Sequence, residues 1–333
     1  MPTRRRAQPE HVPLMRAAAR WNPWRHPRLA VVANVVVLAV FGAAVQHYWG
    51  WQHLLAPWHR IGAEVAFVGV CGMLVSYTLR ALRVYLAERE IPRGQLCASL
   101  RLILISNVFN ILLPMRSGEA SFPILMRRWF GTDLRHGTGT LIWLRVLDLH
   151  VLAAIGVACA ALGWLGRDQL AMEWIPVLAA LCVAAPVAAY LLRRPLARRF
   201  ERHAGRLART ATEAMGALPT APGGLVRDLG LTWVAWGVKL ASLGYVLARL
   251  ASLSPALGVL GAIGGDLSTV LPIHAPGGFG TFEAGVLLLL APARAPTPAL
   301  LAAAVNLHLL VLATAMGAGG LAWLMPRRRD PAP

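Results

Sequence analysis

The sequence predicts an all-α protein that crosses a membrane several times. Three observations predict it: 57% of the 333 residues are apolar, only 14% are charged, and the mean hydropathy is +0.55. A soluble domain carries about 25% charged residues, so a soluble core with a charged shell does not fit this composition. Uncharged stretches of about 20 residues recur along the chain, and a helix of that length spans the roughly 30 Å apolar core of a bilayer.

About six full spans are expected. The first, at 29–49, is uncharged and follows a basic segment at 1–28. That segment resembles the start of a signal peptide, but the apolar part is longer than in a signal peptide and no clear cleavage site follows it. We therefore expect an uncleaved helix here. The other full spans are expected at 61–86, 137–165, 171–192, 225–250 and 297–325.

Two further apolar stretches, 96–130 and 256–291, are interrupted. Each contains a Leu-Pro pair followed by glycines and a carboxylate, and proline and glycine break helices. Broken helices at membrane depth are tolerated only inside protein or beside water. Each stretch is therefore predicted to form a re-entrant hairpin of two half-helices that enters and leaves on the same side. The alternative is that both stretches cross the membrane fully, with compensating changes in topology.

The arginines predict the orientation, because cytoplasmic loops are enriched in basic residues. With the N-terminus inside, 22 arginines lie in inner segments, which include the loop 193–210 and the tail 327–333. The outer loops carry only Arg60, Arg167, Arg249 and Arg294. We therefore expect the cytoplasmic membrane, with both termini in the cytoplasm. The segment 193–210 is expected to be a basic cytoplasmic loop, either solvated or forming an amphipathic helix on anionic headgroups.

Other classes of function are disfavoured. The net charge of +18 lies in short blocks between apolar stretches, which does not indicate nucleic-acid binding. The four cysteines form no CxxC pair and the histidines show no metal-ligand spacing, so neither a metal nor a cofactor is expected. No nucleophile–base set or phosphate-binding loop is present, and we do not expect an enzyme.

The two interrupted stretches predict an internal repeat. Pro114 and Pro272 lie 158 residues apart, near half the chain length, and each hairpin is preceded and followed by a full span. In the predicted topology the first hairpin opens to the cytoplasm and the second to the outside. This is the pattern of an inverted repeat, with halves at about 61–165 and 225–325, whose broken helices build a site near the midplane. Because the matching segments are short, chance similarity remains the alternative.

Ionisable residues inside the apolar stretches indicate where that site lies. An isolated charge at the bilayer centre costs about 2.5–3.5 kcal/mol, so these residues must face one another, a wet cavity or the interface. One interpretation is a polar cavity for an anionic lipid headgroup, and the other is a set of structural ion pairs. The residues concerned are Arg101, Arg116, Glu119, Arg145, Asp148, Lys239, Asp266 and Glu283.

A headgroup phosphate would find two kinds of partner in such a cavity. The half-helices after each break begin with free backbone N–H groups, near Ser117–Glu119 and near Gly278–Thr281, and these attract anions. Arg116 or Arg145 would add a bidentate contact. Glu119, Asp148 and Glu283 would balance the arginines or carry a proton or cation.

Three motifs carry a resemblance to a known family. The first is Asn-Val-Phe-Asn-Ile-Leu-Leu-Pro at 107–114, followed by Arg116, Gly118, Glu119, Arg127 and Gly131. The second is Arg-Val-Leu-Asp at 145–148, and the third is Pro-Gly-Gly-Phe-Gly-Thr-Phe-Glu at 276–283, just after Leu271-Pro272. Over about 30–325 these resemble the lysylphosphatidylglycerol synthase transmembrane (flippase-like) family.

The resemblance implies a bacterial or archaeal membrane protein that moves, or helps to move, a polar lipid between leaflets. It implies these candidate site residues: Arg116, Gly118, Glu119, Asp148, Gly277, Gly278, Gly280 and Glu283. The sequence departs from the family pattern at Leu144, where a glutamate is frequent, and at Met115-Arg116-Ser117, where a Gly-Arg-Ala-like run is common. We expect a stand-alone member without an aminoacyl-transferase domain.

The expected function is therefore a lipid flippase, with a single transmembrane domain at 29–326 and membrane lipids as its partners. Two alternatives remain open. One is a membrane-embedded enzyme acting on lipid-linked precursors, with Asp148 or Glu283 as base, and the other is an accessory scaffold for envelope synthesis. The sequence does not specify the lipid, the energy source or the oligomeric state.

Overall fold

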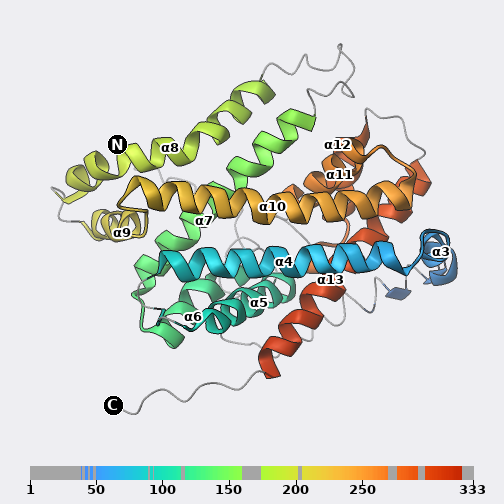
Figure 1. Cartoon of the computed structure of the whole chain (residues 1–333), viewed down its shortest axis with the longest axis horizontal. Coiled ribbons are helices and arrows are strands. Elements are labelled where there is room, and N and C mark those ends of the chain that lie inside the picture. The colour runs from blue at the N-terminus through green and yellow to red at the C-terminus, as the bar shows by residue number, and fades with distance from the viewer. Residues whose placement is uncertain are drawn as a thin grey trace, which may run out of the picture.

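The structure is a computed structural model, and within the residues it describes the regular secondary structure is helical (Figure 1). The predicted first span at 29–49 lies almost wholly outside those residues. The basic segments at 1–28 and 327–333 lie outside them as well. The described residues are 39, 42–43, 46–47, 50–88, 91–92, 94–113, 117–159, 174–201, 205–268, 276–291 and 297–324.

Five helices in the described part of the chain are long and apolar enough to cross a membrane. Their bounds lie within a few residues of the predicted spans, except that α8 continues nine residues beyond its predicted end at 192. The multi-pass helical fold is thereby confirmed. The five helices are α4 (Ala63–Ala87), α7 (Leu134–Cys159), α8 (Trp174–Glu201), α10 (Pro222–Ala251) and α13 (Thr297–Leu324).

Both interrupted stretches break into two helices, as predicted. The first consists of α5 (Leu96–Leu112), η1 (Ser117–Ala120) and α6 (Ser121–Phe130). The second consists of α11 (Pro255–Ser268), η4 (Pro276–Gly278) and α12 (Thr281–Leu290). The two prolines that predicted the breaks, Pro114 and Pro272, lie outside the described residues.

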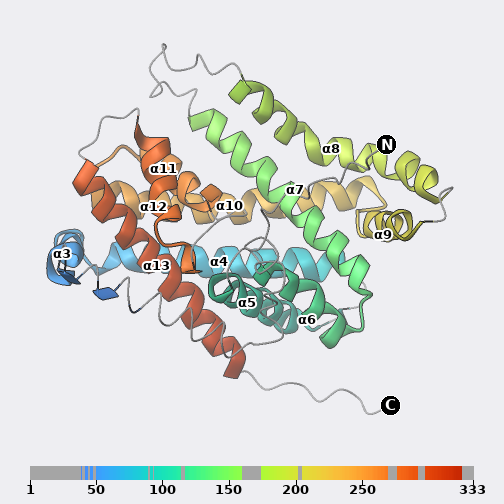
Figure 2. The same cartoon turned by 180° about the vertical axis from the view of Figure 1, so that it is seen from behind.

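The two hairpins approach the middle of the molecule from opposite ends. In Figures 1 and 2, α4 and α10 run side by side in opposite directions along the long axis, and α10 packs more extensively on α4 than on any other helix. The first hairpin packs on α4 through α5, and the second packs through α11 on the C-terminal half of α10. The two meet where η4 contacts α5.

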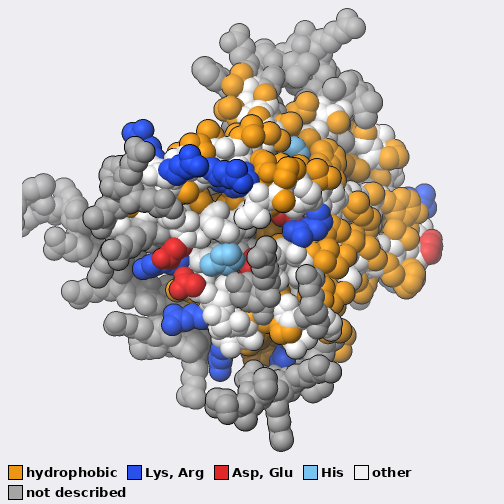
Figure 3. All heavy atoms as spheres, turned by 60° about the vertical axis from the view of Figure 1, so that its left-hand side comes forward, with side chains coloured by type: hydrophobic (Ala, Val, Ile, Leu, Met, Phe, Trp, Pro, Cys, Tyr) orange, Lys and Arg blue, Asp and Glu red, His pale blue; other side chains and the backbone are white. Residues whose placement is uncertain are grey.

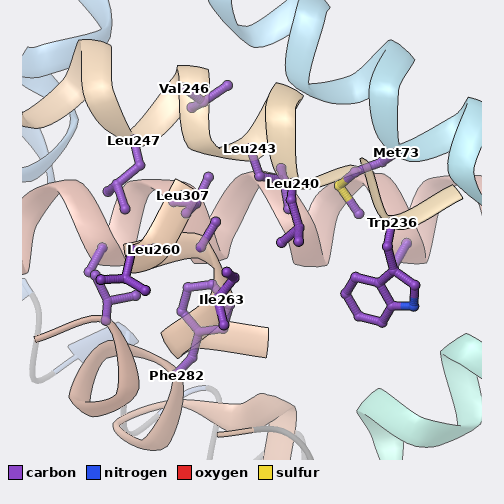
Figure 4. Packing of buried hydrophobic residues seen from close by; sticks show 14 of the residues in the cluster. Met73, Trp236, Leu240, Leu243, Val246, Leu247, Leu260, Ile263, Phe282 and Leu307 are labelled. Atoms are coloured by element: carbon purple, nitrogen blue, oxygen red, sulfur yellow. The ribbon is translucent and has the colours of Figure 1, made fainter. Parts of the chain in front are cut away.

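A core of aliphatic and aromatic side chains joins α4, α10, α13 and the second hairpin (Figure 4). Leu243 and Leu247 of α10 face Leu307 of α13 and Phe282 of α12, and all four side chains are almost fully buried. These helices converge on a shared apolar centre, which fixes the angle at which the second hairpin enters.

Glycines let the helix backbones approach closely. A Cβ added to Gly285 of α12 would lie 2.2 Å from the carbonyl oxygen of Gly264 in α11, and one added to Gly258 would lie 2.2 Å from that of Gly244 in α10. A side chain at these positions would force the helices apart. The run of small residues at 261–265 is typical of closely packed helices. In the structure, Gly264 of this run lies against Gly285 of α12.

The basic segment at 193–210, for which a solvated loop and an amphipathic helix were the alternatives, is helical at 193–201 and 206–210. α8 runs on to Glu201 and α9 (Arg206–Met215) follows, packed against α7 and α8. Arg193 stacks over the ring of Tyr190 and donates to the carbonyl of Thr220, which ties it to the preceding turn and to the start of α10. Figure 3 brings this end forward and shows Lys and Arg side chains gathered on it beside a hydrophobic flank.

We predict that Gly285→Ala destabilises the protein by about 1–3 kcal/mol, because the added methyl group overpacks the contact between α11 and α12. The measurement is the midpoint of thermal or denaturant unfolding in detergent. Gly237→Ala is the matched control: nothing lies within 4 Å of a Cβ there, so the better helix propensity of alanine should leave stability equal or higher. Equal effects of the two substitutions would contradict the close packing.

Candidate substrate cavity

A cavity of about 450 Å³ lies where the two hairpins meet α4, α7, α10 and α13. This volume falls within the range of ligand-binding pockets, about 300–1,000 Å³. Its wall mixes apolar side chains with charged groups contributed by five helical elements. The charged residues in the wall are Arg80, Glu119, Arg145, Asp148, Lys239 and Asp266.

Asp148 of α7 is the hub of this wall. Its Oδ1 accepts hydrogen bonds from Arg83 Nη1 at 3.3 Å and from Trp236 Nε1 at 2.9 Å. Its Oδ2 accepts from Arg80 Nη2 at 3.4 Å and from Arg145 Nη1 at 3.3 Å. Arg145 and Asp148 lie three residues apart and therefore share one face of α7. The carboxylate thus links three helices: α4, α7 and α10.

Arg80 and Arg83 are not among the site residues predicted from the sequence. They lie three residues apart, on one face of α4, near the end of a span that contains one other charged residue, Glu64. That i, i+3 spacing was the available signal. Arg83 is only 2% exposed and also donates to the hydroxyl of Thr232 in α10. A buried guanidinium is tolerated when its charge is neutralised nearby. Asp148 supplies that counter-charge and accepts from both terminal nitrogens of Arg83, whereas Arg83 Nε has no hydrogen-bond partner in the described part of the chain.

The first break brings Glu119 to the cavity. Its Oε1 lies 2.7 Å from Arg145 Nη2, so Arg145 bridges Glu119 of the hairpin and Asp148 of its own helix. Gly118 is buried against α5, where an added Cβ would lie 2.3 Å from the Phe109 carbonyl oxygen. Its role here is close packing. Arg116, which with Arg145 is one of the two predicted phosphate ligands, lies outside the described residues, and Ser117 begins η1.

The second break is shaped by three glycines with positive φ, Gly277, Gly278 and Gly280, at 69°, 77° and 82°. Residues with a side chain rarely adopt this conformation. Gly277 and Gly278 line the cavity, whereas Gly280 precedes the first turn of α12. The chain therefore reverses here with its backbone beside the cavity.

Glu283 lies in the first turn of α12 and binds groups on both sides of it. Its Oε2 accepts the Gly280 N–H at 2.7 Å, which caps α12, and its Oε1 lies 2.7 Å from His308 Nδ1 of α13. His308 in turn stacks on Phe282 with ring centroids 4.4 Å apart. The start of α12, where a substrate phosphate was expected, thus carries the protein's own carboxylate. Glu283 lies behind the wall and supports it through His308.

Two more of the predicted intramembrane charges pair with each other across α10 and α11. Lys239 Nζ lies 2.7 Å from Asp266 Oδ1, and both side chains are buried. Lys239 also lies 4.8 Å from the ring of Trp236, whose centroid is 5.8 Å from the guanidinium carbon of Arg80. Arg101 lies outside the cavity wall, with its guanidinium 5.2 Å from the ring of Trp129.

In the described ranges, no group of three His, Cys, Asp or Glu side chains is placed to hold a metal ion. The cavity instead offers guanidinium and amide groups from α4, α5 and α7, beside the glycine backbone of the second break. Such groups bind oxyanions and hydroxyl groups.

We predict that Asp148→Asn destabilises the protein by about 3–5 kcal/mol, because it leaves Arg83 buried without its counter-charge. Unfolding of the detergent-solubilised chain measures this. Glu213→Gln is the matched control, since Glu213 pairs with Arg135 at 2.7 Å but both side chains are more than 40% exposed. That exposed pair should contribute about 1 kcal/mol or less to the free energy of unfolding. If Glu213→Gln lowers this free energy more than Asp148→Asn does, the central role of the aspartate is refuted.

Comparison with protein families gives a match over most of the chain. Residues 29–319 match the family model described as lysylphosphatidylglycerol synthase TM region. That range includes both hairpins, the cavity and four of the long helices, and it ends within the fifth, α13. No curated protein and no solved structure matches the chain.

Proposed function

Since the chain belongs to the family of the lysylphosphatidylglycerol synthase TM region, we propose that it is a flippase that moves a polar, phosphate-bearing lipid between the leaflets of the cytoplasmic membrane. Family membership supports a lipid-related function in a membrane. The observation that carries the finer proposal is a cavity with charged residues in its wall, formed by helices that carry exposed apolar side chains on other faces. A lipid headgroup needs such a polar site to pass the hydrocarbon layer.

Arg80 and Arg145 are the proposed phosphate ligands. Both line the cavity, and both keep donor capacity after pairing with carboxylates. The Nε atom of each is buried without a hydrogen-bond partner in the described part of the chain. A planar guanidinium binds two phosphate oxygens at once. Arg116, at the first break, remains a predicted third ligand.

Alternating access is the proposed mechanism. The hairpins come from opposite ends of the molecule and touch at the cavity, where η4 contacts α5. We propose that they form an inverted repeat, each re-entrant from its own side, and that rocking of one half against the other exposes the cavity to each leaflet in turn. The arginine-rich end at α8 and α9 is proposed to lie in the cytoplasm, against anionic headgroups.

An enzymatic role receives less support from the same residues. Asp148 and Glu283 were the possible bases. The oxygens of Asp148 already accept hydrogen bonds from three arginines and a tryptophan, and those of Glu283 are used by Gly280 and His308. Neither carboxylate has an oxygen directed only at the cavity for taking a proton from a substrate. We therefore propose that the protein transports a lipid, in preference to an enzymatic role or to a role as a scaffold that binds no ligand.

We predict that Arg80→Lys and Arg145→Lys slow lipid transfer by about tenfold each, because lysine keeps the charge but loses the planar, two-point contact with phosphate. The assay is leaflet-to-leaflet transfer of a labelled phospholipid in proteoliposomes.

Arg135→Lys is the control for this assay, because Arg135 lies in an exposed pair with Glu213 outside the cavity and should transfer lipid at the wild-type rate. If wild-type vesicles transfer lipid no faster than empty ones, the flippase proposal is wrong.

A further inference from the structure

Glu283 differs from the other carboxylates around the cavity in the kind of partner that neutralises it. Glu119, Asp148 and Asp266 pair with arginine or lysine side chains, which stay protonated at neutral pH. The partner of Glu283 is His308, whose Nδ1 lies 2.7 Å from Glu283 Oε1. Histidine gains and loses a proton between about pH 5 and 8. Among the described residues around the cavity, this pair is therefore the one whose net charge can change near neutral pH.

The pair is almost fully buried, and its imidazole belongs to the cavity wall. Because Glu283 already accepts the Gly280 N–H, we assign the hydrogen of the pair to His308 Nδ1, which leaves Nε2 as the basic nitrogen. A Cβ on Gly278 would lie 3.5 Å from Nε2. The basic nitrogen thus lies on the side of the ring away from Glu283, beside a cavity-lining residue that has no side chain to cover it.

The surroundings of the imidazole suit a proton better than a larger cation. Phe282 stacks on the ring with centroids 4.4 Å apart, and the centroid of Phe279 lies 4.9 Å away. In the described ranges no set of three His, Cys, Asp or Glu side chains surrounds a point where a metal ion could bind. A proton needs only one lone pair and no shell of ligands, and His308 Nε2 supplies that lone pair.

The charges around the cavity show which ligand the proton would accompany. Four basic side chains face four carboxylates there, so these described groups sum to zero while His308 is neutral. A singly charged phosphodiester in the cavity would leave one negative charge in excess, and a buried uncompensated charge is costly. A proton on His308 removes the excess. The groups counted are Arg80, Arg83, Arg145 and Lys239, with Glu119, Asp148, Asp266 and Glu283.

We propose that Glu283 and His308 form a proton-binding site, and that one proton crosses the membrane together with each anionic lipid. This rests on the proposed function, since lipid passage is the event that turns the cavity from one side to the other. On the loading side, a proton from water bonds to His308 Nε2, while Nδ1–H keeps its hydrogen bond to Glu283. On the other side the N–H bond breaks, the electron pair stays on Nε2, and the proton returns to water.

The other titratable groups on the helices around His308 titrate outside the range of histidine, because they are tyrosine, arginine, lysine and aspartate side chains. Those in the cavity wall are Tyr77 and Arg80 of α4, Lys239 of α10 and Asp266 of α11. α5 contributes asparagines to the wall and no titratable residue. α3 (Trp51–Ile61) bonds to α13 through Asn306, and its His59 side chain is exposed. A response near neutral pH should therefore come from His308.

The test measures how a pH difference distributes a tracer lipid between the two leaflets of proteoliposomes. The vesicles are of phosphatidylcholine with a trace of labelled phosphatidylglycerol, whose phosphodiester keeps one negative charge throughout. With one proton per lipid, the ratio between leaflets should change about tenfold for each unit of pH difference, in favour of the alkaline side. A membrane potential set by potassium and valinomycin should leave the ratio unchanged, because the loaded and the empty cavity are both neutral.

Two variants locate the proton site. His308→Gln removes the proton acceptor, although its carboxamide can still donate to Glu283. Glu283→Gln removes the negative charge, although its carbonyl can still accept the Gly280 N–H. In each variant the ratio should no longer follow the pH difference, and lipid that still crosses should follow the membrane potential. His150→Gln is the matched control, since His150 is also buried but bonds to the Val183 carbonyl outside the cavity wall, and it should respond as the wild type does.

The outcomes separate the inference from the proposed function. If wild-type lipid crosses but its ratio follows the membrane potential and not the pH difference, the inference is wrong while the flippase proposal stands. If both glutamine variants at the pair keep the wild-type pH response, the proton binds elsewhere and the inference is again wrong. If lipid crosses no faster than in empty vesicles, the flippase proposal itself fails. The wild-type ratio decides the inference even where a variant does not fold, which its thermal unfolding midpoint shows.

Discussion

The requirement that a charge within a lipid-facing bundle be neutralised nearby shapes the centre of this molecule. Asp148 pairs with Arg83, Arg80 and Arg145 and accepts a hydrogen bond from Trp236, and it thereby links α4, α7 and α10. Arg145 extends the same network to Glu119 in the first hairpin. The charged residues that make the cavity polar are thus also the residues that hold its walls together.

The two breaks supply the rest of the cavity. A continuous helix would satisfy its backbone internally and present only side chains, whereas the glycine turn at Gly277 and Gly278 brings main chain to the wall. The Glu283 carboxylate then caps α12, and His308 holds that carboxylate from α13. The second hairpin is therefore anchored by polar contacts at its tip and by apolar packing of Phe282 along its side.

Sequence patterns predict most of the fold, because the length of an uncharged stretch and the positions of proline and glycine are local properties. They place five long helices and two broken ones. They do not predict the partners of Asp148 beyond Arg145, because such contacts depend on how each helix is rotated about its axis. Trp236 and His308 were missed for that reason, whereas Arg80 and Arg83 had a local signal in their i, i+3 spacing within a predicted span. The continuation of α8 through its arginines falls in the segment for which the sequence left a solvated loop and an amphipathic helix as alternatives.

The contact between Gly264 and Gly285 has a consequence for how relatives of this protein can diverge. Each glycine faces the carbonyl oxygen of the other at a distance that leaves no room for a methyl group on either side. A substitution at one position can be accommodated only by a change in helix separation, and a glycine retained on the opposite helix does not provide that space. We therefore expect natural variants to keep both glycines or to replace both together, with a wider hairpin.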